Sequence, residues 1–250
     1  QALKQLGISP SKTSVGSLLS IAVKSIRILL IPASWQSLRT EEQKRHSILA
    51  HKIFENNQIA FEKKIISAGD ISLHSVMQAI KSGEPRNIGL GYSEAAYTWS
   101  AFGLHLFGNL CLRRSGRIES ELDDDEFRGY WFYCRATALY WGGDLQQSAK
   151  FYELAIPLLR RCQNLLSLQV GLHMNRHLLA FAGSATEELA AAESVFKLAG
   201  ATGTRQGKCW GAYDLANALS RNGRLIEAAN YMKLANATLT GERYYMTEAI

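Results

Sequence analysis

The stretch GGDLQQSAKFYELA, residues 142–155, returns closer to the end of the chain as NGRLIEAANYMKLA, residues 222–235. The two stretches align without a gap. Each places a glycine, a leucine, a small residue, a bulky residue and an alanine at the same spacing. After the glycine turn, apolar residues recur at the three- and four-residue spacing of an amphipathic helix. We therefore predict that the chain contains repeated helix–turn–helix units.

The helix before each turn repeats as well, because Ala136 aligns with Ala216. A third copy between these two is matched on Ala180, Leu189, Ala192, Phe196 and Ala199. In this alignment Phe196 takes the place of Tyr152 and Met232, so the three copies are unevenly spaced along the chain. One helix pair cannot bury its own apolar face, so we expect the pairs to stack.

The composition agrees with a helical protein. Of the 250 residues, 47% are hydrophobic and only four are prolines, and few helix breakers over this length favour long helices. The segment Ser67–Gly83 is interpreted as a further turn followed by a helix. Because the chain begins with Gln1 and not with Met, we expect it to be a segment of a larger protein.

The cysteines indicate the compartment in which the protein works, and the charge distribution indicates what it contacts. The four cysteines have no tight spacing and we expect no signal peptide before them, which together predict a reducing cytoplasm. The net charge of +6 belongs to residues 1–65, which carry ten basic and four acidic residues. These basic residues are dispersed, so a solvated helix face is favoured and no specific nucleic-acid contact is predicted.

An apolar stretch at Val15–Ile31 raises the question of a membrane span. Lys24 and Arg27 interrupt it, so it is a poor transmembrane segment. Together with Ser17 and Ser20 they form one narrow polar stripe on a helix. We expect a largely buried helix that shows this polar edge and ends before Pro32. The alternative is a helix that lies on a membrane surface or mediates oligomerisation.

The turn glycine with its leucine, and the small, bulky and alanine positions after it, resemble the tetratricopeptide repeat. The resemblance implies an all-α, right-handed solenoid of antiparallel helix pairs over residues 66–250, with basic N-terminal helices in 1–65 that pack on or cap the array. The order of features also resembles the helical-repeat region of large bacterial signal-transducing ATPase regulators. It implies a non-enzymatic, cytoplasmic protein- or ligand-binding module.

In this family the second, fifth, ninth and twelfth places of each repeat point to the concave face of the solenoid. Carried over to this chain, they imply a groove made by Tyr130, Tyr133, Thr137, Tyr140, Met174, His177, Trp210, Tyr213 and Asn217, and the same places also hold Phe181, Ser184 and Ser220. Aromatic residues of this kind anchor interfaces. The implied partner is a protein, a peptide, another domain of the same chain or a small-molecule effector. The alternative is that some of these side chains pack between repeats.

Several stretches fall short of motifs that carry chemistry. Residues 202–209 lack the first glycine and the final hydroxyl of a phosphate-binding loop. Ser93, one residue from a nucleophile motif, is explained more simply as a helix N-cap. His173 and His177 share a helix face, but no ligand cluster lies near them in sequence. Acidic residues 123–126 suit a helix start. We predict no catalytic residue, cofactor or metal, and an all-α enzyme with dispersed site residues remains the alternative.

Overall fold

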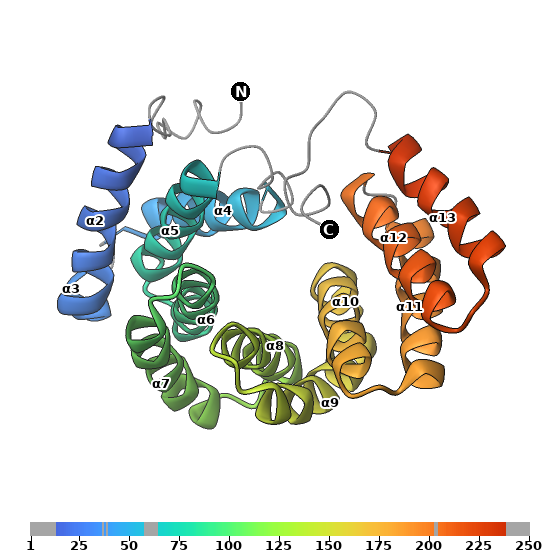
Figure 1. Cartoon of the computed structure of the whole chain (residues 1–250). Coiled ribbons are helices and arrows are strands. Elements are labelled where there is room, and N and C mark those ends of the chain that lie inside the picture. Colours follow the sequence, from blue (N-terminus) through green and yellow to red (C-terminus); the bar gives the residue numbers. More distant parts are fainter. Residues whose placement is uncertain (1–13, 37, 39, 58–64, 203–204, 239–250) are drawn as a thin grey trace. The chain divides into compact units, whose positions relative to one another are not determined.

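The computed structural model describes residues 14–36, 38, 40–57, 65–202 and 205–238, in which every regular element is an α-helix (Figure 1). The helices are α2 (Ser14–Leu30), α3 (Ala33–Gln36), α4 (Glu41–Asn57), α5 (Ile65–Lys81), α6 (Pro85–Ala101), α7 (His105–Glu121), α8 (Asp125–Trp141), α9 (Leu145–Arg161), α10 (Leu165–Phe181), α11 (Ala185–Thr202), α12 (Arg205–Arg221) and α13 (Leu225–Thr238). Within these ranges no helix combines the length and hydropathy that a membrane crossing needs. The all-α prediction is confirmed.

From α5 onward, the first residues of successive helices are evenly spaced along the chain. Gly103, Gly143, Gly183 and Gly223 stand in four of the turns, with φ angles of +76°, +83°, +76° and +75°. Glycine adopts this left-handed conformation without the steric cost that a Cβ atom brings. Each of these glycines closes the first helix of a pair, so the pairs repeat at a constant period. We call the alignment of the pairs on these glycines the glycine register.

The glycine register corrects the predicted third copy. Gly183 occupies the turn position midway between the equivalent glycines of the other two copies. The residue equivalent to Tyr152 and Met232 is therefore Ala192. Phe196 lies about one helical turn further along α11. The predicted uneven spacing of the copies is wrong because a shift of one turn keeps apolar residues on the same face of a helix.

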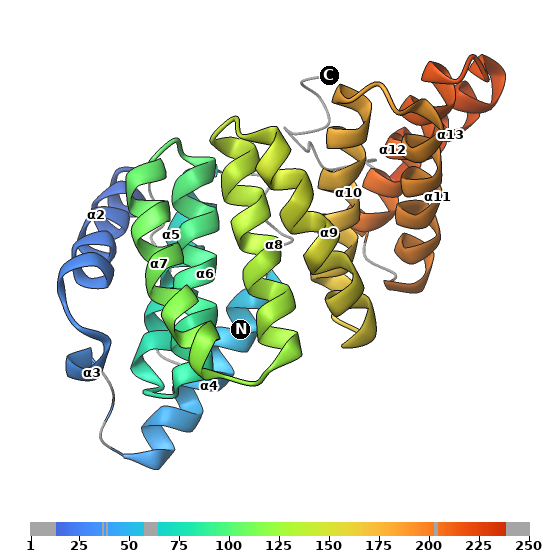
Figure 2. The ribbon, with the colours of Figure 1, turned by 90° about the horizontal axis from the view of Figure 1, so that it is seen from below.

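The chain divides into two compact units. The first holds α2 to α7 with the start of α8 up to Phe127, and the second holds Arg128–Tyr140 of α8 with α9 to α13. Within the second unit, α10 and α11 form one antiparallel pair and α12 and α13 another (Figure 2). Helices of adjacent pairs share apolar cores, one of which joins Ala192 of α11 to Leu219 of α12 and Ala228 of α13. The predicted solenoid of antiparallel helix pairs is confirmed.

Of two predicted helix starts, one is wrong and one is confirmed. The prediction that Ser93 caps a helix is wrong, because α6 begins well before it at Pro85, a residue suited to the first turn. Ser93 is buried in the middle of α6, where its hydroxyl donates to the carbonyl of Gly89 at 3.0 Å. The acidic start of α8 is confirmed, since Oδ1 of Asp124 accepts a hydrogen bond from the amide of Phe127 at 2.9 Å.

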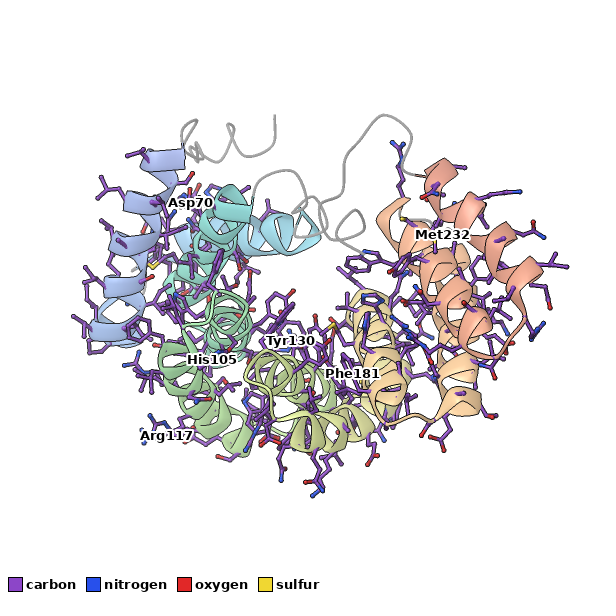
Figure 3. The ribbon with its side chains drawn as sticks, in the orientation of Figure 1. Asp70, His105, Arg117, Tyr130, Phe181 and Met232 are labelled. Atoms are coloured by element: carbon purple, nitrogen blue, oxygen red, sulfur yellow. The ribbon has the colours of Figure 1, made fainter. Side chains whose placement is uncertain are left out.

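The orientation of α2 differs from the prediction, although Arg27 of the polar stripe is exposed as expected. Ser17 and Lys24, from the polar stripe that should face solvent, are buried, whereas Leu19 from the apolar side is exposed. Nζ of Lys24 donates to Oδ1 of Asp70 on α5 at 2.5 Å, and Figure 3 shows Asp70 between α2 and α5. A buried cation needs a counter-ion, so Asp70 fixes which side of α2 turns inward. The sequence pattern of α2 alone could not reveal a partner on another helix.

Candidate functional site

The first helices of the three pairs in the second unit are α8, α10 and α12, and they lie side by side. A methyl group placed on Gly171 of α10 would lie 3.8 Å from Cδ2 of Tyr133 on α8. On its other side, α10 contacts α12 through His173 and Asp214. We call the aligned sides of these helices the first-helix face, defined by Tyr130, Tyr133, Tyr140, His173, His177, Trp210 and Asn217.

Four of the predicted groove residues lie on α8, and they differ in accessibility. Tyr130 and Tyr133 are each only 7% exposed, and their ring centroids are 5.8 Å apart. Thr137 is buried, and its hydroxyl is 2.7 Å from the hydroxyl of Tyr152 on α9. Tyr140 is half-buried, and burial raises the pKa of its hydroxyl. Thr137 therefore joins the two helices of its own pair, while Tyr140 retains access to solvent.

The glycine register changes which residues of α10 belong to the first-helix face. The predicted Met174 is buried, and Phe181 is 67% exposed. Figure 3 labels Phe181 on α10. In the glycine register, the equivalents of the α8 and α12 face residues include His173 and His177. His177 was predicted from the wrong register, and His173 was missed.

On α12 the predicted residues share one side of the helix. Trp210 and Asn217 are half-buried, whereas Tyr213 is 8% exposed. The side-chain amide of Asn217 donates from Nδ2 to the backbone carbonyl of Tyr213 at 3.0 Å. Trp210 stacks on the imidazole of His173, with ring centroids 4.9 Å apart and an interplanar angle of 6°. The stack places an aromatic surface of α12 against α10.

A buried charge network lies next to this stack. Arg176 of α10 is 1% exposed. Its Nη1 donates to Oε1 of Glu188 on α11 at 3.0 Å, and its Nη2 is 3.1 Å from Oδ1 of Asp214 on α12. Glu188 also accepts hydrogen bonds from Nε and Nη2 of Arg221 on α12, the shortest being 2.8 Å. Asp214 in turn contacts Nδ1 of His173 through Oδ2 at 2.6 Å. The network ties α10, α11 and α12 together.

Sequence reasoning missed this network because of the register error. In the glycine register, Arg176 and Glu188 stand where the first pair has Ala136 and Ser148. Those two residues make a close contact, in which the Ser148 hydroxyl donates to the carbonyl of Ala136 at 2.8 Å. The signal was Gly183, whose spacing from the other turn glycines aligns a charged pair with two small residues.

His173, His177 and Asp214 offer ligand atoms within 4.8 Å of one another, a spacing that a metal ion could bridge. The hydrogen bonds of these residues favour the guanidinium of Arg176, and not a metal ion, as the cation at this position. Nε2 of His177 lies 2.8 Å from Nη2 of Arg176, and a guanidinium can only donate. The single lone pair of the neutral ring is therefore taken. The permanent charge of Arg176 also lies beside Asp214 and opposes a second cation there.

The pKa of His177 agrees with this arrangement. Burial, followed by the nearby His173 and Arg176, lowers its pKa to about 3. The ring is therefore neutral near neutral pH and acts as an acceptor for Arg176.

The phosphate-loop near-match at residues 202–209 falls partly outside the described residues, because 203–204 are not described. Residues from Arg205 onward belong to α12, so Lys208 projects from a helix and not from a loop.

The stacked antiparallel pairs and their glycine turns define the class of protein: the chain is a tetratricopeptide-like helical-repeat region. Solved structures agree in fold. A putative kinesin light chain with nearly identical tetratricopeptide-like repeats from Podosopora anserina is 16% identical over 85% of this chain and 100% of its own, with a TM-score of 0.53. A signal transduction ATPase with numerous domains and a tetratricopeptide repeat sensor from Pyrococcus horikoshii is 13% identical, with a TM-score of 0.58. The match covers 91% of this chain and 38% of that protein.

No protein-family model matches the chain, and no curated protein matches it in sequence. Because the sequence identities are low, the two structural likenesses show the fold alone. What the first-helix face binds has to be argued from its own side chains.

Proposed function

We propose that the second unit binds a peptide segment, of a partner protein or of another domain of the same chain, on its first-helix face. The observation that carries the proposal is the stack of Trp210 on His173 at the junction of α10 and α12. Half-buried aromatic rings next to polar groups are typical anchors of interfaces. Arg221, whose side chain is 49% exposed, adds a cation at the end of the same helix. The role is non-enzymatic.

The charge network supports the proposal because it holds the supporting helices in place. A binding face works best when its side chains are fixed before the partner arrives. Arg176 and Glu188 link the three helices from inside, and Asp214 orients the ring of His173 through Nδ1. The accessible side of the stack is then presented in one orientation. A small-molecule effector that contacts the same residues would act by favouring one arrangement of α10 and α12.

We further propose that the chain belongs to a larger cytoplasmic regulatory protein. The structural neighbour with a tetratricopeptide repeat sensor is a multidomain signal-transduction ATPase, of which this chain matches 38%. The bacterial source and the boundary between residues 1–65 and 66–250 stay predictions. Determining the protein sequence on both sides of residues 1–250 tests this proposal, because the proposal requires attached domains such as an ATPase.

The peptide-binding proposal is tested with a library of random dodecapeptides displayed on phage and selected on the chain. Peptides that bind the first-helix face lose at least about tenfold in affinity for Trp210→Ala, measured by fluorescence anisotropy. Phe107→Ala is the matched control, because it removes an exposed aromatic ring on α7 of the first unit, which does not belong to this face. Circular dichroism confirms that both variants are folded. Selected peptides that bind Trp210→Ala as tightly as wild type, or a selection that enriches none, contradict the proposal.

A further inference from the structure

The first unit presents an unusual surface on α2. Six large aliphatic side chains of this helix are more than half exposed, and the most exposed are Val15 at 78%, Leu30 at 74% and Leu19 at 68%. The other three are Leu18, Val23 and Ile26. Scattered exposed aliphatic residues are normal, but a continuous row on one helix marks an interaction surface.

The rotation of α2 is fixed by polar contacts on its other side. Lys24 is held by Asp70, and Nζ also donates to Oγ of Ser20 at 2.6 Å. Arg114 of α7 donates from Nη1 and Nη2 to the carbonyls of Ile28 and Leu29, both at 2.7 Å. Turning the aliphatic side inward would break these contacts and leave Lys24 without its counter-ion. The row of aliphatic residues therefore faces outward in the folded unit.

The exposed aliphatic residues other than Leu18, together with Ala22, lie at symmetric positions along the helix. Val15, Leu19, Ala22, Val23, Ile26 and Leu30 form a row that we call the α2 stripe. When a second α2 lies antiparallel across a two-fold axis between residues 22 and 23, each residue of the stripe faces another. Val15 then opposes Leu30, Leu19 opposes Ile26, and Ala22 opposes Val23. A two-fold interface needs this kind of self-complementary pattern.

Size and charge also suit a second copy. Ala22 lies at the centre of the α2 stripe, where a small residue allows two helices to approach closely. The only charged side chain of α2 that is exposed is Arg27. In the antiparallel arrangement, the two copies of Arg27 are displaced from the axis in opposite directions by about 7 Å each. No like charges face each other across the axis.

We infer that two copies of this chain associate through antiparallel α2 helices, with the α2 stripe as the interface. The inference rests on the first unit and is independent of the peptide-binding proposal. A single helix pair buries less than the roughly 800 Å² per partner of a standard interface. The dimer is therefore weak, with a Kd in the micromolar range or above.

Sedimentation equilibrium on the 250-residue chain, from about 1 to 200 µM, tests the inference. Wild type shows a monomer–dimer equilibrium, and Leu19→Glu raises its Kd at least about tenfold by placing a carboxylate opposite Ile26. Leu106→Glu is the matched control and leaves the Kd unchanged, because Leu106 is 83% exposed on α7 and lies outside the α2 stripe. A monomer at the highest concentration, or a dimer that Leu19→Glu leaves intact, overturns the inference. So does a monomer that binds vesicles of phosphatidylserine and phosphatidylcholine.

Disulfide trapping gives a second test that does not depend on Leu19→Glu. In a Cys162→Ser background, Ala22→Cys forms a cross-linked dimer on oxidation, because residue 22 lies next to the axis. Val15→Cys alone does not, since the two copies of residue 15 are about 22 Å apart along the helices. Val15→Cys combined with Leu30→Cys cross-links. Efficient cross-linking of Val15→Cys alone indicates parallel helices and overturns the proposed arrangement.

Discussion

The middle helix pair of the second unit and the pairs on either side of it have the same backbone arrangement. They differ in the side chains through which the two helices of a pair contact each other. Where α8 meets α9, Ala136 and Ser148 bring the two helices together through small side chains and a neutral hydrogen bond. At the equivalent positions of α10 and α11 stand Arg176 and Glu188, both 1% exposed. The charged pair costs desolvation, so it requires further partners, and those partners are on α12.

The difference shows which contacts lie within one helix pair and which connect two neighbouring pairs. A small-residue contact is complete within its own helix pair. The Arg176–Glu188 pair is not, because Arg176 also forms an ion pair with Asp214 and Glu188 also accepts hydrogen bonds from Arg221, and both of these partners belong to the next pair. The same Asp214 positions His173 against Trp210. A replacement of two small residues by two charged ones thus links internal packing to the surface that we propose for binding.

The largest expected effect comes from breaking the charged pair on one side. Glu188→Ala leaves the guanidinium of Arg176 buried with only part of its partners, which costs about 3–5 kcal/mol of unfolding free energy. Urea denaturation followed by circular dichroism measures it. The exposed neighbour Glu187 provides the matched control, because Glu187→Ala removes a carboxylate of the same charge from solvent. Equal midpoints for the two variants would show that the pair contributes nothing.

The middle pair also predicts a pH dependence. His177 has an ordinary pKa of 6.5 that folding lowers to about 3. Between these values the unfolded state binds a proton that the folded state does not, so stability falls as the pH drops below 6.5. Between pH 7 and pH 5 this group contributes a loss of up to about 2 kcal/mol. His177→Gln, which can still accept from Arg176, shows a smaller loss in the same titration of unfolding free energy. An unchanged loss contradicts the assignment to His177.

The flanking pair predicts a smaller effect. Ser148→Ala removes the hydrogen bond to the carbonyl of Ala136, which already takes part in the α8 helix. The change also gives the alanine that the last pair has at this position, Ala228. We expect a loss of about 1 kcal/mol or less, measured in the same urea titrations. A loss as large as that of Glu188→Ala would remove the distinction between the two kinds of contact.

Local patterns predicted the fold because helices, turns and small-residue contacts are encoded within each pair. The gapless match between residues 142–155 and 222–235 places Tyr152 and Met232 correctly: Tyr152 is buried, and Met232 is partly buried against the apolar core of α12 and α13. The middle copy slipped by one turn because apolar spacing tolerates such a shift, while Gly183 marks the true register. The turn glycine is the more reliable marker, since its φ angle leaves few alternatives.

The candidate site was predicted only in part, because its decisive contacts join different helices. Aromatic residues such as Trp210 could be placed on a helix face from their spacing. The partners of Arg176 are Glu188 on the following helix and Asp214 on the next helix pair, both remote in sequence. The buried Lys24 was misplaced for the same reason, since its partner Asp70 belongs to α5. An ion pair between helices has no local signature.

The central claim is that Arg176 and Glu188 act as one replacement for two small residues, so that each is harmful without the other. A double-mutant cycle tests it most directly, with Arg176→Ala, Glu188→Ala and the combined variant measured by urea denaturation. The combined variant restores the alanine pair that α12 and α13 have at Ala216 and Ala228. We predict that it is less destabilised than Glu188→Ala alone. A combined loss equal to the sum of the two single losses would contradict the account.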